Sequence, residues 1–173
     1  LAARWERPPL ARWEPSAFGM VEGGTLKLAD NDSDRSPLVA RVAGAGERYA
    51  LSASIRCYGG PTRRISVIMR YADANTFARL WANDSGTVFY QECLNGLFSL
   101  PRSVGTAPLA DDVWHEWEVR VEGRAVGVTV DGGSVGQTHA SEKLVRDLAA
   151  KPVHVGLSTH DAWAEVGRVR VEV

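Results

Sequence analysis

Side chains suited to binding a polar ligand recur at alternate positions in three stretches in the middle of the chain. They are Arg70 in the first stretch, Arg79 and Trp81 in the second, and Tyr90 and Glu92 in the third. Alternate residues of a strand share one face, so neighbouring strands would gather these groups on one sheet surface. Aromatic rings cover the C–H faces of sugars, while guanidinium and carboxylate groups pair with hydroxyls. The pattern predicts a sugar-binding surface. The alternative is that Trp81 and Tyr90 fill the core, and that Arg70 with Glu92 is a sheet-surface ion pair of little consequence.

A second candidate is a polar segment near the C-terminus that contains His160 and Trp163. It lies between two apolar stretches, where a loop connecting two strands is expected, and loops often carry binding residues. We therefore add His160 and Trp163 to the candidate ligand-binding residues. A structural tryptophan that covers one end of the fold is an equally open interpretation.

A candidate metal site begins at Asp30, Asp32 and Asp34, which place three carboxylates at alternate positions, as at the start of a calcium loop. An EF-hand is excluded, because Arg35 stands where the turn needs glycine and Arg41 where it needs a bidentate glutamate. The simplest interpretation is a solvated acidic loop. A structural calcium ion with ligands recruited from elsewhere is the alternative, and no other cofactor is expected.

The histidines and cysteines do not form a nucleophilic or zinc site. The histidines are His115, His139, His154 and His160. They are scattered, without a serine or cysteine elbow nearby. His115 alternates with Trp117 on an apolar face, so we expect a hydrogen-bonded core histidine there. Cys57 and Cys93 lack the short spacing of zinc ligands, which leaves two free thiols or one disulfide open.

Short extended segments must position all of these residues. Alternating apolar and polar residues, separated by Gly, Asn and Asp, predict strands at 25–29, 38–42, 48–57, 64–71, 76–82, 86–93, 113–122, 125–130, 153–158 and 165–173. Turn residues at this spacing indicate an antiparallel sandwich or barrel. The exception is 141–150, where Leu144, Val145 and Leu148 have helical spacing and Ser141 is a suitable N-cap. The predicted fold class is all-β with at most one short helix.

Length, composition and charge limit the other possibilities. The chain has 173 residues, of which 45% are hydrophobic, so we expect a single domain over 1–173 with a core of its own. Lys and Arg total 20 against 21 Asp and Glu, and the charges are dispersed, so a nucleic-acid partner is not expected. No apolar run approaches the ~20 residues that span a bilayer. The N-terminal residues have Arg, Glu and Pro where a signal peptide would have its apolar core.

Four local patterns connect the chain to a known fold. They are Trp13-Glu14-Pro15 with the turn at 22–26, the strand pair over 51–77 with its Asp-x-Asn turn, the hairpin over 114–132, and the closing pair over 154–171. In the hairpin, apolar and charged residues alternate, Glu122-Gly123-Arg124 supplies the turn, and Asp131-Gly132 provides the positive-φ residues for a further tight turn after the second strand. These patterns resemble the concanavalin A-like lectin and glucanase superfamily, in particular its laminin G-like jelly-roll branch of secreted bacterial carbohydrate-active proteins. The resemblance implies a two-sheet antiparallel jelly-roll sandwich, often with sugar bound on a concave face, and a secreted protein.

The catalytic patterns of that superfamily are missing from the sequence. Its β-glucan hydrolases carry Glu-x-Asp-x-x-Glu on one strand, whereas here Glu116, Glu118 and Glu122 lie on the charged face of the hairpin and are interpreted as solvated. Its lyases carry Gln-x-His, whereas Gln91 is followed by Glu92 and Cys93.

We therefore expect a non-catalytic carbohydrate-binding module, tethered to other domains of a secreted glycan-active protein. One alternative is a glycosidase or lyase with an atypical site, in which Glu92 or Asp161 is the acid or base. The other is a structural or adhesion domain.

Overall fold

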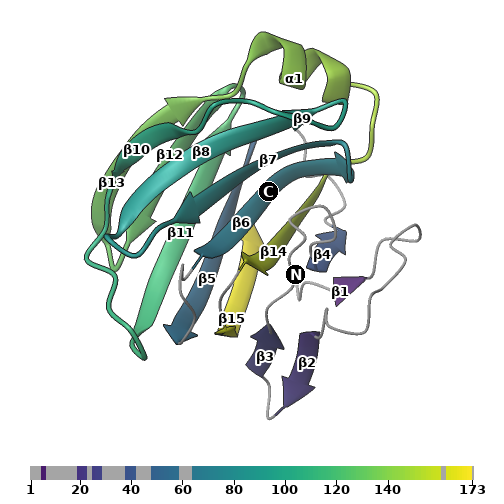
Figure 1. Cartoon of the computed structure of the whole chain (residues 1–173). Coiled ribbons are helices and arrows are strands. Elements are labelled where there is room, and N and C mark those ends of the chain that lie inside the picture. Colours follow the sequence, from purple (N-terminus) through teal and green to yellow (C-terminus); the bar gives the residue numbers. More distant parts are fainter. Residues whose placement is uncertain are drawn as a thin grey trace.

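The computed structural model describes the backbone of residues 5–6, 19–22, 25–28, 38–41, 48–58, 64–160 and 163–172. Side chains are described for 48–57, 65–159 and 164–172. Within these ranges the chain forms two antiparallel sheets and one helix (Figure 1). No helix of this described part is both long and apolar enough to cross a membrane.

The first sheet, sheet A, has the strand order β1-β4-β14-β6-β7-β8-β10, with β9 paired to β8. Its strands are β1 (Trp5–Glu6), β4 (Leu38–Arg41), β6 (Arg64–Asp73), β7 (Thr76–Ala82), β8 (Thr87–Leu94), β9 (Leu97–Phe98), β10 (Arg102–Thr106) and β14 (His154–His160).

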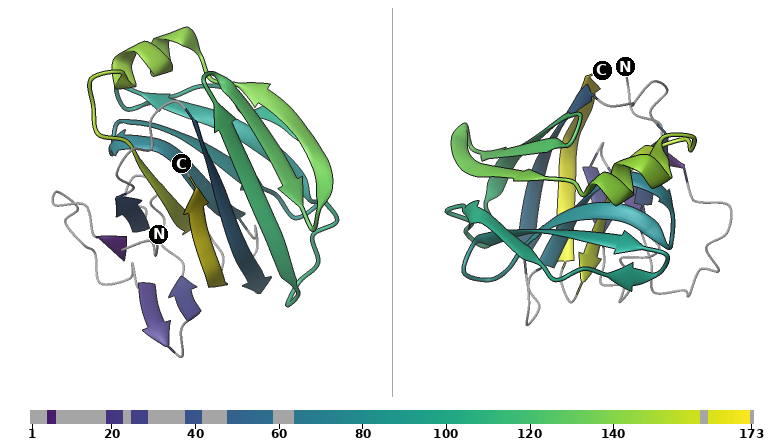
Figure 2. Two further views of the ribbon diagram at one scale, coloured as in Figure 1. Left: turned by 180° about the vertical axis from the view of Figure 1, so that it is seen from behind. Right: turned by 90° about the horizontal axis from the view of Figure 1, so that it is seen from above.

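The second sheet, sheet B, has the order β13-β12-β11-β5-β15-β3-β2. Its strands are β2 (Gly19–Glu22), β3 (Thr25–Leu28), β5 (Arg48–Tyr58), β11 (Trp114–Glu122), β12 (Ala125–Val130), β13 (Gly133–His139) and β15 (Trp163–Glu172). Seen from above, the two sheets form separate layers with the helix at one end (Figure 2). The predicted all-β sandwich is confirmed.

The core lies between the sheets and follows the alternation of the sequence. The inward residues of β11 and β12 are buried, whereas Glu116, Arg120 and Glu122 between them are exposed. Cross-strand pairs such as Val119 with Val128 set the register of this hairpin. Burial of one face therefore specifies the pairing, because a slip of one residue would turn the apolar side chains toward water.

The predicted helix is confirmed and is shorter than expected. Helix α1 (Glu142–Leu148) starts at the N-cap Ser141, whose hydroxyl accepts the backbone N–H of Leu144 at 3.1 Å. Leu144 and Leu148 are buried. The cap satisfies one of the free amides of the first turn, and the two leucines attach the helix to the sandwich.

Two edge strands that the sequence did not predict close one side of the sandwich. Strands β10 and β13 approach each other through their glycines. A Cβ built on Gly105 would overlap the carbonyl oxygen of Val135, and one on Gly136, at φ +155°, would overlap that of Val104. Only glycine permits this approach of the two backbones.

The two cysteines are free thiols, on β5 of sheet B and on β8 of sheet A. The disulfide alternative is therefore not realised in this structure. Burial, followed by the nearby charge of Asp111, raises the pKa of the Cys57 thiol to about 12. The thiol is consequently protonated and unreactive at neutral pH.

Candidate functional site

The five residues predicted to share one sheet surface lie on two different faces. Arg79 pairs with Gln91 across β7 and β8, and Trp81 pairs with Phe89, so both lie on the outer face of sheet A. Tyr90 pairs instead with Leu80, a core residue, and Tyr90 and Glu92 therefore face sheet B. The prediction of one common surface is wrong. The hairpin turn between β7 and β8 fixes a register that the alternation within each strand does not reveal.

Arg70 is also inside the sandwich. The register between β6 and β7 shifts between Met69 and Asp73, and Arg70 has φ +53°, a left-handed conformation that is uncommon for residues other than glycine. This bulge directs its guanidinium across to sheet B, where Nη2 donates to the carbonyl oxygen of Gly123. Only 4% of Arg70 is exposed, so it is removed from the candidate sugar contacts.

Glu92 acts as a buried support for the helix. Its carboxylate accepts the Tyr90 hydroxyl at 2.9 Å, and from Ser141 it accepts the backbone N–H at 2.7 Å and the hydroxyl at 2.6 Å. Arg102 Nη2 lies 3.8 Å from Glu92 Oε1, and the Arg102 guanidinium stacks on the Tyr90 ring. Burial, then the charge of Glu92, raises the pKa of Tyr90 above its usual value. These contacts assign Tyr90 and Glu92 to helix attachment.

The outer face of sheet A gathers aromatic and polar side chains from four adjacent strands. We call this set the aromatic face: Ser66, Arg79, Trp81, Phe89, Gln91 and Ser158. One row across the strands runs from Ser158 through Ser66 and Trp81 to Phe89. The Trp81 and Phe89 rings stack with centroids 4.5 Å apart. Trp81 is only 9% exposed and both serines are buried, whereas Phe89 and Arg79 are half-buried. The part of this face that solvent reaches therefore belongs mainly to Phe89 and Arg79.

The second row supplies the polar groups of the aromatic face. The Arg79 guanidinium donates to Gln91 Oε1 from Nε at 3.1 Å and from Nη2 at 2.6 Å, and Gln91 Nε2 donates to the Ser99 carbonyl at 2.7 Å. Arg79 also stacks on Phe98 with 4.8 Å between the guanidinium carbon and the ring centroid. Burial lowers the pKa of Arg79 to about 10, so it stays cationic at neutral pH. The result is a fixed guanidinium beside a tryptophan.

Phe89, Gln91, Ser66 and Ser158 were not singled out from the sequence. The turn sequence Asn83-Asp84-Ser85-Gly86 could have indicated Phe89 and Gln91, because a tight turn fixes which residues of the two strands are paired. The Asn83 amide donates to the Thr87 carbonyl at 3.1 Å, and the Gly86 amide donates to the Asn83 carbonyl at 3.0 Å. Counting back from this tight turn pairs Trp81 with Phe89.

The other predicted residues are only partly placed. His160 is the last residue of β14 and pairs with Arg64, and Trp163 is the first residue of β15 and pairs with Tyr58. The predicted loop is therefore a two-residue connection between strands of different sheets; the side chains of His160 and Trp163 lie outside the described residues. The same holds for Asp30, Asp32 and Asp34, and the calcium site stays a prediction. In the described part of the chain, His, Cys, Asp and Glu form no group of three suited to a metal ion.

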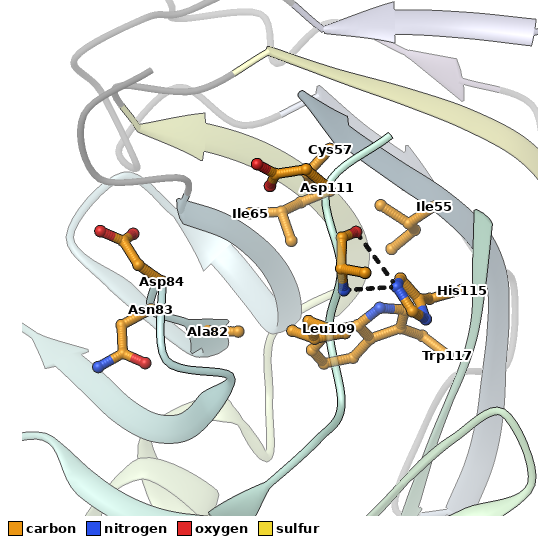
Figure 3. A pocket seen from close by; sticks show the side chains of 11 residues that line it. Ile55, Cys57, Ile65, Ala82, Asn83, Asp84, Leu109, Asp111, His115 and Trp117 are labelled. Atoms are coloured by element: carbon orange, nitrogen blue, oxygen red, sulfur yellow. Dashed lines mark hydrogen bonds between the residues drawn. The ribbon is translucent and has the colours of Figure 1, made fainter. Parts of the chain in front are cut away.

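A small pocket of about 40 Å³ lies between the sheets at one end of the sandwich, with Cys57, Leu109 and Trp117 in its lining (Figure 3). His115 closes one side: its Nε2 accepts the Ala110 amide at 3.0 Å, and its Nδ1 lies 2.7 Å from Asp131. The predicted hydrogen-bonded core histidine is confirmed. A space of this size holds water molecules but no sugar ring.

Known structures resemble this architecture closely although their sequences do not. The carbohydrate binding module CBM66 from Bacillus subtilis superposes with a TM-score of 0.72 and 16% identity, over 98% of this chain and 95% of that one. A xylan β-1,4-xylosidase from Bacillus halodurans C-125 gives 0.69 and 14%, over 93% of this chain and 35% of the enzyme. Sheep galectin-11 gives 0.60 and 13%, over 79% of this chain and 97% of the galectin.

These similarities establish the fold. The chain is a two-sheet antiparallel jelly-roll sandwich, the fold of these structures. No protein-family model matches the sequence, and no curated protein matches it either. At such low identities, the function must be argued from the side chains of this chain.

Proposed function

We propose that the protein is a non-catalytic carbohydrate-binding module that holds sugar on the aromatic face of sheet A. The observation that carries the proposal is the fixed guanidinium of Arg79 beside the stacked Trp81 and Phe89 rings. An aromatic ring such as that of the half-buried Phe89, supported from beside by Trp81, covers the apolar C–H face of a sugar, and a planar guanidinium with its hydrogen-bonded amide orients the hydroxyls. The fold shared with a carbohydrate binding module and with galectins supports this assignment.

The arrangement of polar groups favours binding over catalysis. Glycoside hydrolysis requires two carboxyl groups across the scissile bond. The aromatic face as defined from the described residues contains guanidinium, amide and hydroxyl groups without a carboxylate. Glu92, the acid or base of the enzymatic alternative, faces the opposite direction and is engaged by Tyr90 and Ser141.

We also propose that this module is attached to other domains of a longer, secreted chain. This fold makes up about a third of the Bacillus halodurans xylosidase, which supports a module attached to other domains of a secreted glycan-active protein. Detection of the longer chain in the culture medium of its source organism would test both attachment and secretion.

The test of the binding site compares the parent protein with Arg79→Lys and Trp81→Phe by isothermal titration calorimetry, on glycans first selected by affinity electrophoresis. Arg79→Lys keeps the charge but loses the planar fork, and Trp81→Phe reduces the stacking area. We expect each substitution to weaken binding about tenfold or more, which corresponds to about 1.4 kcal/mol. The matched control is Arg48→Lys, an exposed arginine on β5 of the other sheet.

Melting curves accompany each titration, because both residues also contact other side chains of the sheet. A folded Arg79→Lys protein that binds like the parent would contradict the proposed site. Uniform absence of binding across a broad glycan panel would remove the function. If the protein released reducing ends from a bound glycan, it would be a glycosidase or lyase, and the assignment as a non-catalytic module would be wrong.

A further inference from the structure

The outer face of sheet B carries an open trough that the proposed function does not use. Its volume is about 250 Å³, and it is lined by Ala50, Ser52, Glu116, Glu118, Arg120, Arg168, Arg170 and Glu172. This is many times the ~10–15 Å³ that a site needs to hold one water molecule. The trough is therefore large enough for a small polar molecule.

The trough follows β5, the strand between its two walls. The outward residues in the middle of β5 are small, namely Ala50, Ser52 and Ser54, whereas long charged side chains stand on β11 and β15 to either side. Register places Glu118 and Arg170 on opposite sides of Ser52. Small residues between rows of long ones produce a recess in an otherwise flat sheet.

Most of the wall charges are neutralised within their own strand. Arg120 pairs with Glu118 on β11, and Arg170 pairs with Glu172 at 2.8 Å on β15. Ion pairs therefore run along the walls, and those described do not bridge the trough. The recess between the walls stays open to a ligand.

Trp114 lies next to one end of the trough, two residues before the lining residue Glu116 on the same face of β11, and is not itself part of the lining. Its indole lies over β15, because a Cβ built on Gly167 would be 3.4 Å from the six-membered ring of Trp114. The Arg56 guanidinium stacks on the same indole at 5.1 Å and is anchored by Glu165. The tryptophan nevertheless remains 39% exposed. It is thus a supported aromatic surface that water can reach.

Two charges beside this tryptophan are available to a ligand. The Glu116 carboxylate accepts the Ser54 hydroxyl at 2.5 Å through Oε1, which leaves Oε2 for another donor. Arg168 is exposed and, within the ranges that the structure describes, has no ion pair. It lies in the bulge of β15 between Val166 and Val169, beside Ser54. A carboxylate and a guanidinium thus border one recess.

We propose that Trp114, Glu116 and Arg168 form a second ligand site, which takes an uncharged sugar. The indole covers the C–H face of the ring, Arg168 donates to hydroxyl oxygens, and Glu116 accepts from a hydroxyl. The lining contains three carboxylates and three guanidiniums, so it attracts neither sign of charge. A uronate would meet the open oxygen of Glu116, whereas a neutral ring satisfies both polar groups. The inference is independent of the aromatic face, because the two sites lie on opposite sheets.

The experiment follows the indole N–H resonances of ¹⁵N-labelled protein, with the Trp114 and Trp81 signals assigned from Trp114→Phe and Trp81→Phe. The probes are glucose, galactose, xylose and fructose, together with glucuronate and galacturonate as the acidic counterparts of glucose and galactose. We expect saturable movement of the Trp114 signal with at least one neutral sugar and at least about tenfold weaker binding of the uronates. The movement should persist in Arg79→Lys.

Variants of the wall test the two polar roles. Arg168→Ala should weaken the neutral sugar about tenfold, whereas Arg48→Ala, an exposed arginine outside the trough, should leave its affinity unchanged. Glu116→Gln should strengthen uronate binding at least about threefold, because the repelling charge is gone, and Glu122→Gln should not. The unchanged position of the other indole signals verifies the fold of each variant.

A Trp114 signal that no neutral sugar moves would overturn this inference, as would uronates that bind as tightly as the neutral sugars or an Arg168→Ala protein with the parent affinity. None of these results affects the proposed function, which is read from the Trp81 signal and from glycan titrations of the aromatic face. Conversely, if sugars moved the Trp114 signal but not the Trp81 signal, the trough site would be supported and only the proposed function would be contradicted.

Discussion

Replacing Glu92 tests whether this carboxylate supports the fold, as its contacts indicate, or binds a ligand, as the sequence suggested. It is 5% exposed and accepts three hydrogen bonds, two from Ser141 and one from Tyr90. Glu92→Ala leaves the Tyr90 hydroxyl and the Ser141 amide buried without their acceptor. Removing one partner from a buried charged network costs about 3–5 kcal/mol.

The assay is a thermal melt combined with urea unfolding. For a chain of this length, each kcal/mol lowers the Tm by about 2–4 °C, so Glu92→Ala should melt about 6–20 °C below the parent. Glu92→Gln keeps one acceptor oxygen and should lose less. Glu122→Ala is the matched control, because this glutamate is exposed at the end of β11, and we expect a change within about 0.5 kcal/mol.

Two outcomes would refute this reasoning. A shift of about 2 °C corresponds to about 1 kcal/mol or less. A Glu92→Ala protein that melts within about 2 °C of the parent would therefore show that the network adds little to stability. A Glu92→Gln protein that stays folded but loses glycan affinity would return Glu92 to the ligand-binding residues.

Three further predictions concern the sandwich itself. Gly105→Ala should lower the free energy of unfolding by about 1–3 kcal/mol, because the new methyl group forces β10 away from Val135. Gly127 has open space around it, so Gly127→Ala should leave stability nearly unchanged. Equal melting temperatures of the two variants would contradict the steric argument. The raised pKa of Cys57 and the burial of Cys93 predict negligible labelling by a thiol reagent at pH 8 in the folded state and two reactive thiols in urea, so rapid native labelling would count against the packing. Burial alone would raise the pKa of Asp131, but hydrogen bonds from His115 and the Glu116 amide outweigh it and lower the pKa. A lowered pKa stabilises the fold above the unfolded value near 3.8, and this contribution disappears as the pH falls through the folded value. The stability difference between parent and Asp131→Asn should therefore be larger at pH 7 than at pH 2.5 in urea titrations; a difference independent of pH would refute it.

Local patterns in the sequence determined the fold class, the helix and most of the strands. The β11–β12 hairpin followed from alternation and a glycine turn, and helix α1 from three apolar residues behind a serine cap. Both signals are written within a few consecutive residues. The edge strands β10 and β13 escaped prediction because one side of each faces water, and Gly and polar residues there leave no apolar alternation to detect.

The composition of the candidate site was decided only by tertiary structure. Alternation placed Arg79 and Trp81 together on one strand, and the structure keeps them together. Which residues of the next strand join them depends on hairpin register, and this exchanged Tyr90 and Glu92 for Phe89 and Gln91. A single bulge at Arg70 turned its side chain from one face of the sheet to the other.

The trough of sheet B is a second surface that the sequence alone could not predict. The sequence identified Glu116 and its neighbours as a charged, solvated face, and it contains no sign that β5 lies between β11 and β15. That adjacency brings together residues 54, 114 and 168, which are far apart in the chain. Periodicity within a strand is a local property, whereas register and strand order arise from the burial of both sheets at once, and surfaces assembled from several strands can be read only from the folded chain.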